Sequence, residues 1–187
     1  MRSLLQLPAP DVGPRLLGSV LRSTVEDRHV TVVLTEVEAY SADDPASHSY
    51  RGRTPRNASM FGPPGTLYVY RSYGIHWCMN VTTGPEGEAS ALLLRGARIV
   101  EGEEVVRARR GRDDHLTDGP GKLCQALGVT GDHDGIDVLD PDAEITLYPG
   151  TQPAWKATPR IGISRAVEVP WRWVAVGPVS LPAPDTV

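Results

Sequence analysis

The 187-residue sequence predicts an α+β fold built on an antiparallel sheet. Two strand-like segments in the middle of the chain are joined by a connection short enough for a hairpin, and only antiparallel strands allow that connection. A longer β-branched segment precedes them, and short helical patterns lie on either side. Since a chain of this length can bury ~70% of its unfolded surface around one core, we expect residues 1–187 to form a single domain.

The first predicted elements are a short helix and a long strand. In Pro14–Arg22, PRLLGSVLR, apolar residues recur at helical spacing and predict an amphipathic helix. Val30–Tyr40, VTVVLTEVEAY, is rich in β-branched residues and predicts a strand. In strict alternation Glu36 and Glu38 share a face with Leu34 and the valines before it, so we expect two carboxylates to continue an apolar face.

A short helix and a hairpin follow a polar loop. Thr54 followed by Pro55 predicts the cap and first turn of a helix that ends at Gly62. Thr66–Tyr70 and His76–Thr82 predict two strands, and the connection between them, RSYGI, predicts a hairpin tip.

The second half of the chain predicts a strand at Ala89–Arg95, a charged helix at Gly102–Arg110 and a further helix in GPGKLCQALGV. We expect the proline-rich tail from about residue 178 to be frayed. Cys78 and Cys124 lie in apolar runs outside any CxxC pair, which favours buried free thiols. The histidines lack zinc spacing, so we expect no metal.

Charge and hydropathy narrow the class of protein. The net charge is −4, but residues 50–124 carry 11 basic and 8 acidic side chains, a local charge of +3. Of the 19 cations 17 are arginine, the residue best suited to bidentate phosphate contacts. The apolar LLQLP is too short for a signal peptide and no run approaches ~18 apolar residues, so we expect a soluble cytoplasmic protein.

Three tyrosines lie within six residues of the hairpin. Alternation places Tyr68 and Tyr70 on one face, where Tyr70 and Asn80 could offer a pocket an aromatic wall and an amide. Taken alone, however, the tyrosines are better explained by core or cross-strand packing. Tyr73, at the tip beside Gly74, has little to pack against. It is either a surface residue or a wedge that enters the DNA minor groove and fills the place of a flipped nucleotide.

Glu38 allows two interpretations as well. A carboxylate near a strand end is usually solvated, whereas a partly buried one next to an aromatic residue such as Tyr40 could act as a general base. His48, in the loop that follows, is by itself a surface or core histidine.

Five motifs together resemble those of the alkyladenine (3-methylpurine) DNA glycosylase family. They occur in the family's order, the likeness extends from about Leu16 to Trp173, and it is densest from Thr35 to Arg95. The motifs are TEVEAY, ASHSYRGRTPRNASMF, GTLYVYRSYGIHWCMNV, LLLRGARIVEG and GPGKLCQALGV.

The resemblance implies a role for each candidate residue. Glu38 matches the glutamate that activates the attacking water, and Arg95 and the backbone carbonyl of Ile161 match groups that help to hold that water. Tyr40, His48 and Tyr70 match the residues that sandwich the flipped base in the family. Asn80 matches the asparagine that opposes the exocyclic amino group of guanine, and Tyr73 matches the tyrosine that intercalates into the duplex. Tyr68 is left to pack.

The function implied is that of a monofunctional DNA glycosylase. It would hydrolyse the N-glycosidic bond of alkylated or deaminated purines (3-methyladenine, 7-methylguanine and hypoxanthine) in base excision repair, without a cofactor. Neither Lys122 nor Lys156 lies among the matched residues, so no amine is placed for lyase chemistry. We expect a monomer that acts on damaged purines in double-stranded DNA, within the nucleoid, and has no membrane partner.

Two departures and two alternatives accompany this prediction. His48 follows Tyr40 by eight residues, one fewer than in the family pattern, which predicts a reshaped loop, and His76 stands where relatives can have a tyrosine.

The alternative functions are a binder of damaged DNA that does not cut it, and a hydrolase of free nucleosides. The resemblance also implies a curved sheet with surrounding helices.

Overall fold

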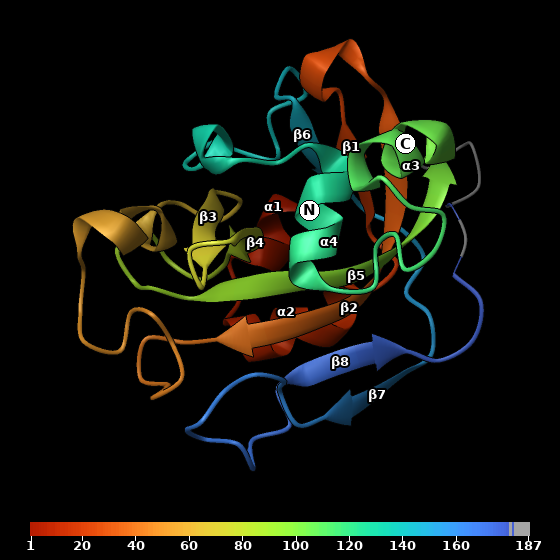
Figure 1. The fold of residues 1–187 in the computed structure, drawn as a ribbon. Coiled ribbons are helices and arrows are strands. Elements are labelled where there is room, and N and C mark those ends of the chain that lie inside the picture. The colour runs from red at the N-terminus through yellow and green to blue at the C-terminus, as the bar shows by residue number, and fades with distance from the viewer. Residues whose placement is uncertain (180, 182–187) are drawn as a thin grey trace.

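The computed structural model describes residues 1–179 and 181, and its centre is a curled antiparallel sheet (Figure 1). The sheet order is β3-β4-β5-β2-β1-β6; β8 pairs with β2, and β7 pairs with β8. The strands are β1 (Val20–Ser23), β2 (Val30–Tyr40), β3 (Leu67–Ser72), β4 (His76–Thr82), β5 (Ala91–Glu101), β6 (Ile145–Tyr148), β7 (Trp155–Thr158) and β8 (Arg172–Ala175). The prediction of an α+β fold with a curved antiparallel sheet is confirmed.

Helices cover the sheet and close the core. α2 packs against β2, β5 and β8, whereas α4 packs against β4 and β5 (Figure 1). Leucines from both helices and from the strands between them are fully buried in one cluster, among them Leu16, Leu34, Leu92 and Leu123. The helices are α1 (Arg2–Leu5), α2 (Ala9–Leu16), α3 (Glu103–Arg110) and α4 (Pro120–Leu127), with 3-10 turns η1 (Val25–Asp27), η2 (Pro55–Phe61) and η3 (Gly131–His133).

The predicted hairpin is formed by β3 and β4. Its strands pair from Leu67 opposite Val81 to Ser72 opposite His76. The turn closes when the N–H of Ile75 donates to the carbonyl of Ser72 (3.0 Å). Both central residues of this turn have positive φ, 51° at Tyr73 and 70° at Gly74, a combination that suits the right-handed twist of the flanking strands. The hairpin tip is therefore a tight, regular turn.

The helix predicted for Pro14–Arg22 is wrong in its second half. α2 ends at Leu16, and Val20–Ser23 is strand β1, paired with both β2 and β6. Gly18 separates the two elements with a φ of 84°, and a Cβ there would lie 2.0 Å from the carbonyl oxygen of Thr151. The sheet partners on both sides of β1 decide its conformation against the local helical spacing.

The prediction that the carboxylates of β2 continue an apolar face is also wrong. Its bounds are those predicted, but the register with β5 shifts between Leu34 and Glu36. One extra residue in a strand reverses the alternation beyond it, so Val37 and Ala39 follow Leu34 into the main core. The bulge thus turns Glu36 and Glu38 away from the core, toward the other face of β2.

Most remaining predictions of secondary structure are confirmed. η2 begins after Thr54, whose hydroxyl accepts from the Asn57 N–H, and α3 and α4 occupy the predicted segments. Cys78 and Cys124 are free and buried. Most of the tail expected to be frayed lies outside the described residues; Val179, within them, is buried against a small cluster of valines. No described helix has the length and apolar character that a membrane crossing requires.

Candidate active site

A cavity of about 320 Å³ opens beside the hairpin and gathers nearly all the residues selected from the sequence. Its walls come from β2, the loop after β2, both hairpin strands, β5 and the loop after β7. The selected residues that line it are Tyr40, His48, Tyr70, Tyr73, Asn80, Arg95 and Ile161. The eighth, Glu38, has no exposed surface and lies behind the wall.

Glu38 is held by three donors on its two oxygens. Oε1 accepts from the backbone N–H of Ile161 (2.8 Å), and Oε2 accepts from the hydroxyl of Tyr40 (2.9 Å) and from Nη1 of Arg95 (3.3 Å). A fully buried carboxylate is tolerated only when it is paired and hydrogen-bonded, and these contacts meet both conditions. All three donors belong to groups that line the cavity, so Glu38 is connected to the cavity through its partners.

Ile161 contributes differently from what the sequence suggested. The contact seen is made by its N–H, which the sequence did not indicate, while the role of its carbonyl oxygen stays a prediction. The neighbouring Arg160 was missed altogether. It forms a buried ion pair with Asp44 and donates to the carbonyl of Ala39 (2.8 Å), which ties the loop after β7 to the end of β2.

Tyr40 lies between this buried arginine and the cavity. The guanidinium of Arg160 lies 4.8 Å from the centroid of the Tyr40 ring. Burial, and after it the nearby charge of Glu38, raises the pKa of Tyr40 well above its ordinary value, so the hydroxyl keeps its proton. Tyr40 is thus a fixed donor to Glu38 and also an aromatic wall.

His48, Tyr68 and Tyr70 form an aromatic cluster in the cavity wall. The rings of His48 and Tyr70 meet edge to face with centroids 4.5 Å apart, and those of Tyr68 and Tyr70 stack at 5.6 Å. Tyr68 packs as predicted, 1% exposed, but its hydroxyl also shares a hydrogen bond with Nδ1 of His48 (3.1 Å), which was not foreseen. Burial, reinforced by the positive charge of Arg56, lowers the pKa of His48 below 6.5, so the ring is neutral at pH 7.

The loop that carries His48 is anchored by one buried amide. Nδ2 of Asn57 donates to the carbonyls of His48 (3.0 Å) and Gly52 (3.1 Å), and its Oδ1 accepts from the N–H of Thr54 (2.6 Å). Asn80, on β4, is also fixed, because its amide nitrogen donates to the carbonyl of Tyr68 (3.1 Å). The backbone beside the aromatic wall therefore has few alternative positions.

Comparison with known proteins agrees with this arrangement. A family model described as methylpurine-DNA glycosylase matches residues 3–178, almost the whole chain. The chain belongs to the methylpurine-DNA glycosylase family. The resemblance found in the motifs is thereby confirmed, and membership supports a DNA glycosylase whose substrate is DNA.

Curated relatives from distant bacteria lead to the same family. A Rhodopseudomonas palustris (strain HaA2) protein is 52% identical over 165 residues, which are 87% of this chain and 80% of the relative. A Mycobacterium tuberculosis (strain ATCC 25177 / H37Ra) protein is 47% identical over 174 residues, 88% of this chain and 84% of the relative. Each relative carries the name "Putative 3-methyladenine DNA glycosylase".

Within this glycosylase fold, the hairpin presents Tyr73 to solvent. The side chain is 91% exposed, and Ile75 beside it is 67% exposed. Both are unusual positions for large apolar groups, and Tyr73 also lines the cavity. The tip is therefore an apolar projection next to the opening.

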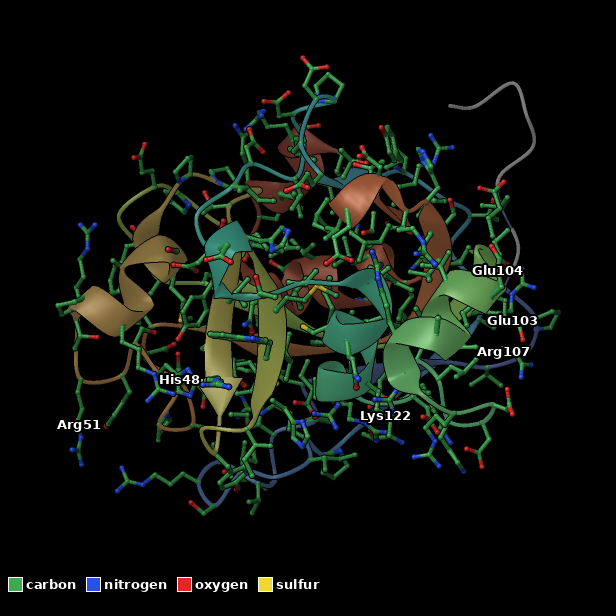
Figure 2. All side chains as sticks on the ribbon, turned by 45° about the horizontal axis from the view of Figure 1, so that its top comes forward. His48, Arg51, Glu103, Glu104, Arg107 and Lys122 are labelled. Atoms are coloured by element: carbon green, nitrogen blue, oxygen red, sulfur yellow. The ribbon has the colours of Figure 1, made fainter. Side chains whose placement is uncertain are left out.

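Two exposed arginines, Arg56 and Arg71, line the cavity, and Arg51 and Arg53 lie on the loop that follows His48. Arg51, Arg53, Arg56 and Arg71 are exposed, and within the described part of the chain none of them forms an ion pair with an acidic side chain. Figure 2 shows His48 beside the hairpin and Arg51 on the adjoining loop, on the opposite side of the view from Glu103, Glu104 and Arg107. Part of the positive charge predicted for the middle third of the sequence thus lies at the cavity.

Proposed function

We propose that this protein is a monofunctional DNA glycosylase that flips an alkylated or deaminated purine out of double-stranded DNA and hydrolyses its N-glycosidic bond in base excision repair. The observation that carries the proposal is the position of Glu38, fully buried directly behind an aromatic cavity whose mouth is flanked by an exposed tyrosine and unpaired arginines. Damaged purines of the 3-methyladenine, 7-methylguanine and hypoxanthine type are the substrates.

The cavity walls suit a flipped purine. Tyr40 on one side and His48 with Tyr70 on the other provide aromatic surfaces, and stacking a base on such a surface contributes about 1–3 kcal/mol. Because His48 is neutral at pH 7, it does not repel a cationic methylated base. Asn80 is buried and fixed at the cavity wall, so its bulk opposes the 2-amino group of guanine and excludes the normal base.

Tyr73 supports the flipped state from outside the cavity. A rigid aromatic side chain at a hairpin tip can enter the minor groove and occupy the space that the base leaves. The arginines at the mouth hold the phosphates on either side and give affinity without reading sequence. Flipping needs both parts, because unstacking a base costs a few kcal/mol.

Hydrolysis then requires a base and a water molecule near C1′. Glu38 takes a proton from the water, whose oxygen bonds to C1′ while the bond from C1′ to the purine nitrogen breaks and its electron pair leaves with the base. The carboxylate also stabilises the positive charge that develops on the sugar. Arg95 and the carbonyl of Ile161 help to hold the water. The product is an abasic site.

The lysines support a glycosylase without lyase activity. A lyase needs an amine that can attack C1′ and form a Schiff base. Neither lysine is among the residues that line the cavity, and Nζ of Lys122 is paired with Asp118 (2.9 Å). The DNA strand should therefore remain intact until alkali is added.

The test is an incubation of the purified protein with a duplex that contains one hypoxanthine, with and without alkali. We expect strand cleavage only after alkali. Cleavage without alkali would contradict monofunctional chemistry, binding without release of base would make the protein a non-catalytic binder, and release from free inosine but not from the duplex would make it a nucleoside hydrolase.

The decisive variant is Glu38→Gln. It removes the base but keeps the shape, so single-turnover excision should fall at least a thousandfold while the gel-shift affinity for the lesion duplex stays within about threefold. Glu104→Gln is the matched control, because Glu104 lies on α3, far from His48 and the hairpin (Figure 2), and should excise like the wild type. Excision by Glu38→Gln within tenfold of wild type would contradict the assignment.

A further inference from the structure

Glu36 is a second carboxylate at the site that the proposed mechanism leaves unused. Its Oε1 accepts from Nε of Arg95 (2.8 Å) and from Nε of Arg172 (2.7 Å). Arg95 in turn reaches Glu38 through Nη1. The four side chains form one row of alternating charge, from Arg172 through Glu36 and Arg95 to Glu38, and none of them is more than 19% exposed. Glu36 itself does not line the cavity.

The irregular pairing of β2 builds this row. The register of β2 with β5 shifts on both sides of Glu36, which stands opposite Gly96. A Cβ at position 96 would lie 3.2 Å from Cβ of Glu36, closer than ordinary contact, so the glycine leaves the carboxylate its room. On the other edge β8 places Arg172 opposite Glu38. Two guanidiniums and two carboxylates are thereby brought together from three strands.

The distances show how Arg95 is divided between the two carboxylates. Its nearer contact, 2.8 Å, is to Glu36, and its contact to Glu38 is 3.3 Å. Although burial lowers it, the pKa of Arg95 is raised overall by Glu38 and Glu36, so the guanidinium stays charged. Without Glu36, this charge and that of Arg172 would have Glu38 as their only buried counterion in the row.

Building on the proposed function, we propose that Glu36 is a positioning residue that holds Arg95 against the cavity wall and balances its charge. With Glu36 present, the charge of Arg95 beside Glu38 is balanced; without Glu36, the charges of both Arg95 and Arg172 would be uncompensated. A carboxylate less strongly stabilised as an anion is a better proton acceptor, so Glu36 keeps Glu38 effective as the base. Glu38 also accepts from the hydroxyl of Tyr40 and the N–H of Ile161, which carry no charge. The hydroxyl of Tyr70 lies near it and is kept protonated by burial, and the nearby cation Arg160 is paired with Asp44.

The sign of the effect follows from the charges. Glu36→Gln removes an anion while its amide oxygen can still accept from Arg95. The excess positive charge favours the ionised form of Glu38, so the acidic limb of the excision rate should move to lower pH. Because the ionised carboxylate is then a weaker base, the plateau rate should fall about threefold, with lesion affinity unchanged.

Arg172 provides the matched test. Arg172→Gln removes a cation from the same row and should move the acidic limb to higher pH. The double variant Glu36→Gln/Arg172→Gln restores neutrality and should bring the limb back toward that of the wild type. A merely structural role would slow or destabilise all three variants without shifts of opposite sign.

The measurements are single-turnover excision of hypoxanthine from pH 4 to 8 and the ¹³C carboxyl titration of Glu38 in the free protein, assigned with Glu38→Gln. The titration does not depend on activity: an inactive wild type would overturn the proposed function alone, while the titration still tests the charge row. A Glu38 titration that is unmoved in Glu36→Gln or Arg172→Gln overturns the role of Glu36. If one variant does not fold, the other still carries the opposite-sign prediction.

Discussion

At the scale of single residues, the site depends on how one buried carboxylate is satisfied. Glu38 accepts hydrogen bonds from a hydroxyl, a guanidinium and a backbone N–H, and it shares the guanidinium with Glu36. Each donor also does something else: Tyr40 stacks, Arg95 connects to Glu36, and Ile161 lines the cavity. Because each donor has a second contact, only a conservative substitution can remove its hydrogen bond to Glu38 and leave that second contact in place.

Tyr40→Phe is the conservative change at this scale. It keeps the ring but removes a hydrogen bond that favours the ionised form of Glu38, so the acidic limb of excision should move to higher pH, the direction opposite to that of Glu36→Gln. Affinity for the lesion duplex should stay within about threefold, because stacking survives. A pH profile identical to that of the wild type would show that the hydroxyl does not act through Glu38.

At the scale of elements, the local sequence predicted those segments whose pattern matches their surroundings. The bounds of β2, the hairpin, α3 and α4 follow from β-branching, short turns, glycines and helical spacing. The second half of the helix predicted for Pro14–Arg22 failed because β1 is held by strands far away in sequence. The face of Glu38 was predicted wrongly because a bulge is a property of two paired strands and leaves no mark in the alternation of one.

The candidate site shows the same division. The residues that line the cavity were found through motifs in the family's order, whereas Arg160, Glu36 and Arg172 were missed. The ion pairs of Arg160 with Asp44 and of Arg172 with Glu36 join positions more than 100 residues apart. In addition, β8 carries no strand signal strong enough to place it against β2. Ion pairs between residues so far apart leave no local sequence pattern from which they could be predicted.

The hairpin yields the prediction that belongs to this scale. Tyr73 has a φ of 51°, a left-handed conformation that costs a non-glycine residue roughly 1–2 kcal/mol. Tyr73→Gly should relieve this strain and should not lower the Tm, yet it should weaken lesion binding by about 1–3 kcal/mol through the lost stacking. Trp155→Ala, on exposed β7, is the control and should bind normally. If Tyr73→Gly binds the lesion duplex as tightly as the wild type, Tyr73 is a surface residue that does not contact DNA.

At the scale of the whole molecule, the local charge at the cavity is opposite in sign to the net charge of the chain. The chain carries −4 overall, yet the mouth of the cavity is lined by arginines without acidic partners among the described residues, while α3 pairs Arg107 with Glu103. Attraction to DNA follows the local field at the contact face and not the sum over the molecule. An acidic isoelectric point is thus compatible with binding to a polyanion.

Salt dependence tests this distribution. The affinity for a lesion duplex should fall steeply with salt, and Arg51→Gln should reduce the slope of log K against log salt by about one. Arg107→Gln makes the same change in net charge on α3, on the opposite side of Figure 2 from Arg51, and should leave the slope unchanged. A wild-type affinity that is independent of salt would contradict binding through the arginine face.

The three donors of Glu38 are separated from it along the chain by very different distances, 2, 57 and 123 residues for Tyr40, Arg95 and Ile161. During synthesis on the ribosome these partners emerge in that order. The hairpin, its arginines and the aromatic walls are all translated before residue 100, whereas the backbone N–H of Ile161 arrives much later. The residues of the hairpin and of the aromatic walls are therefore synthesised well before the last of the three donors that hold Glu38.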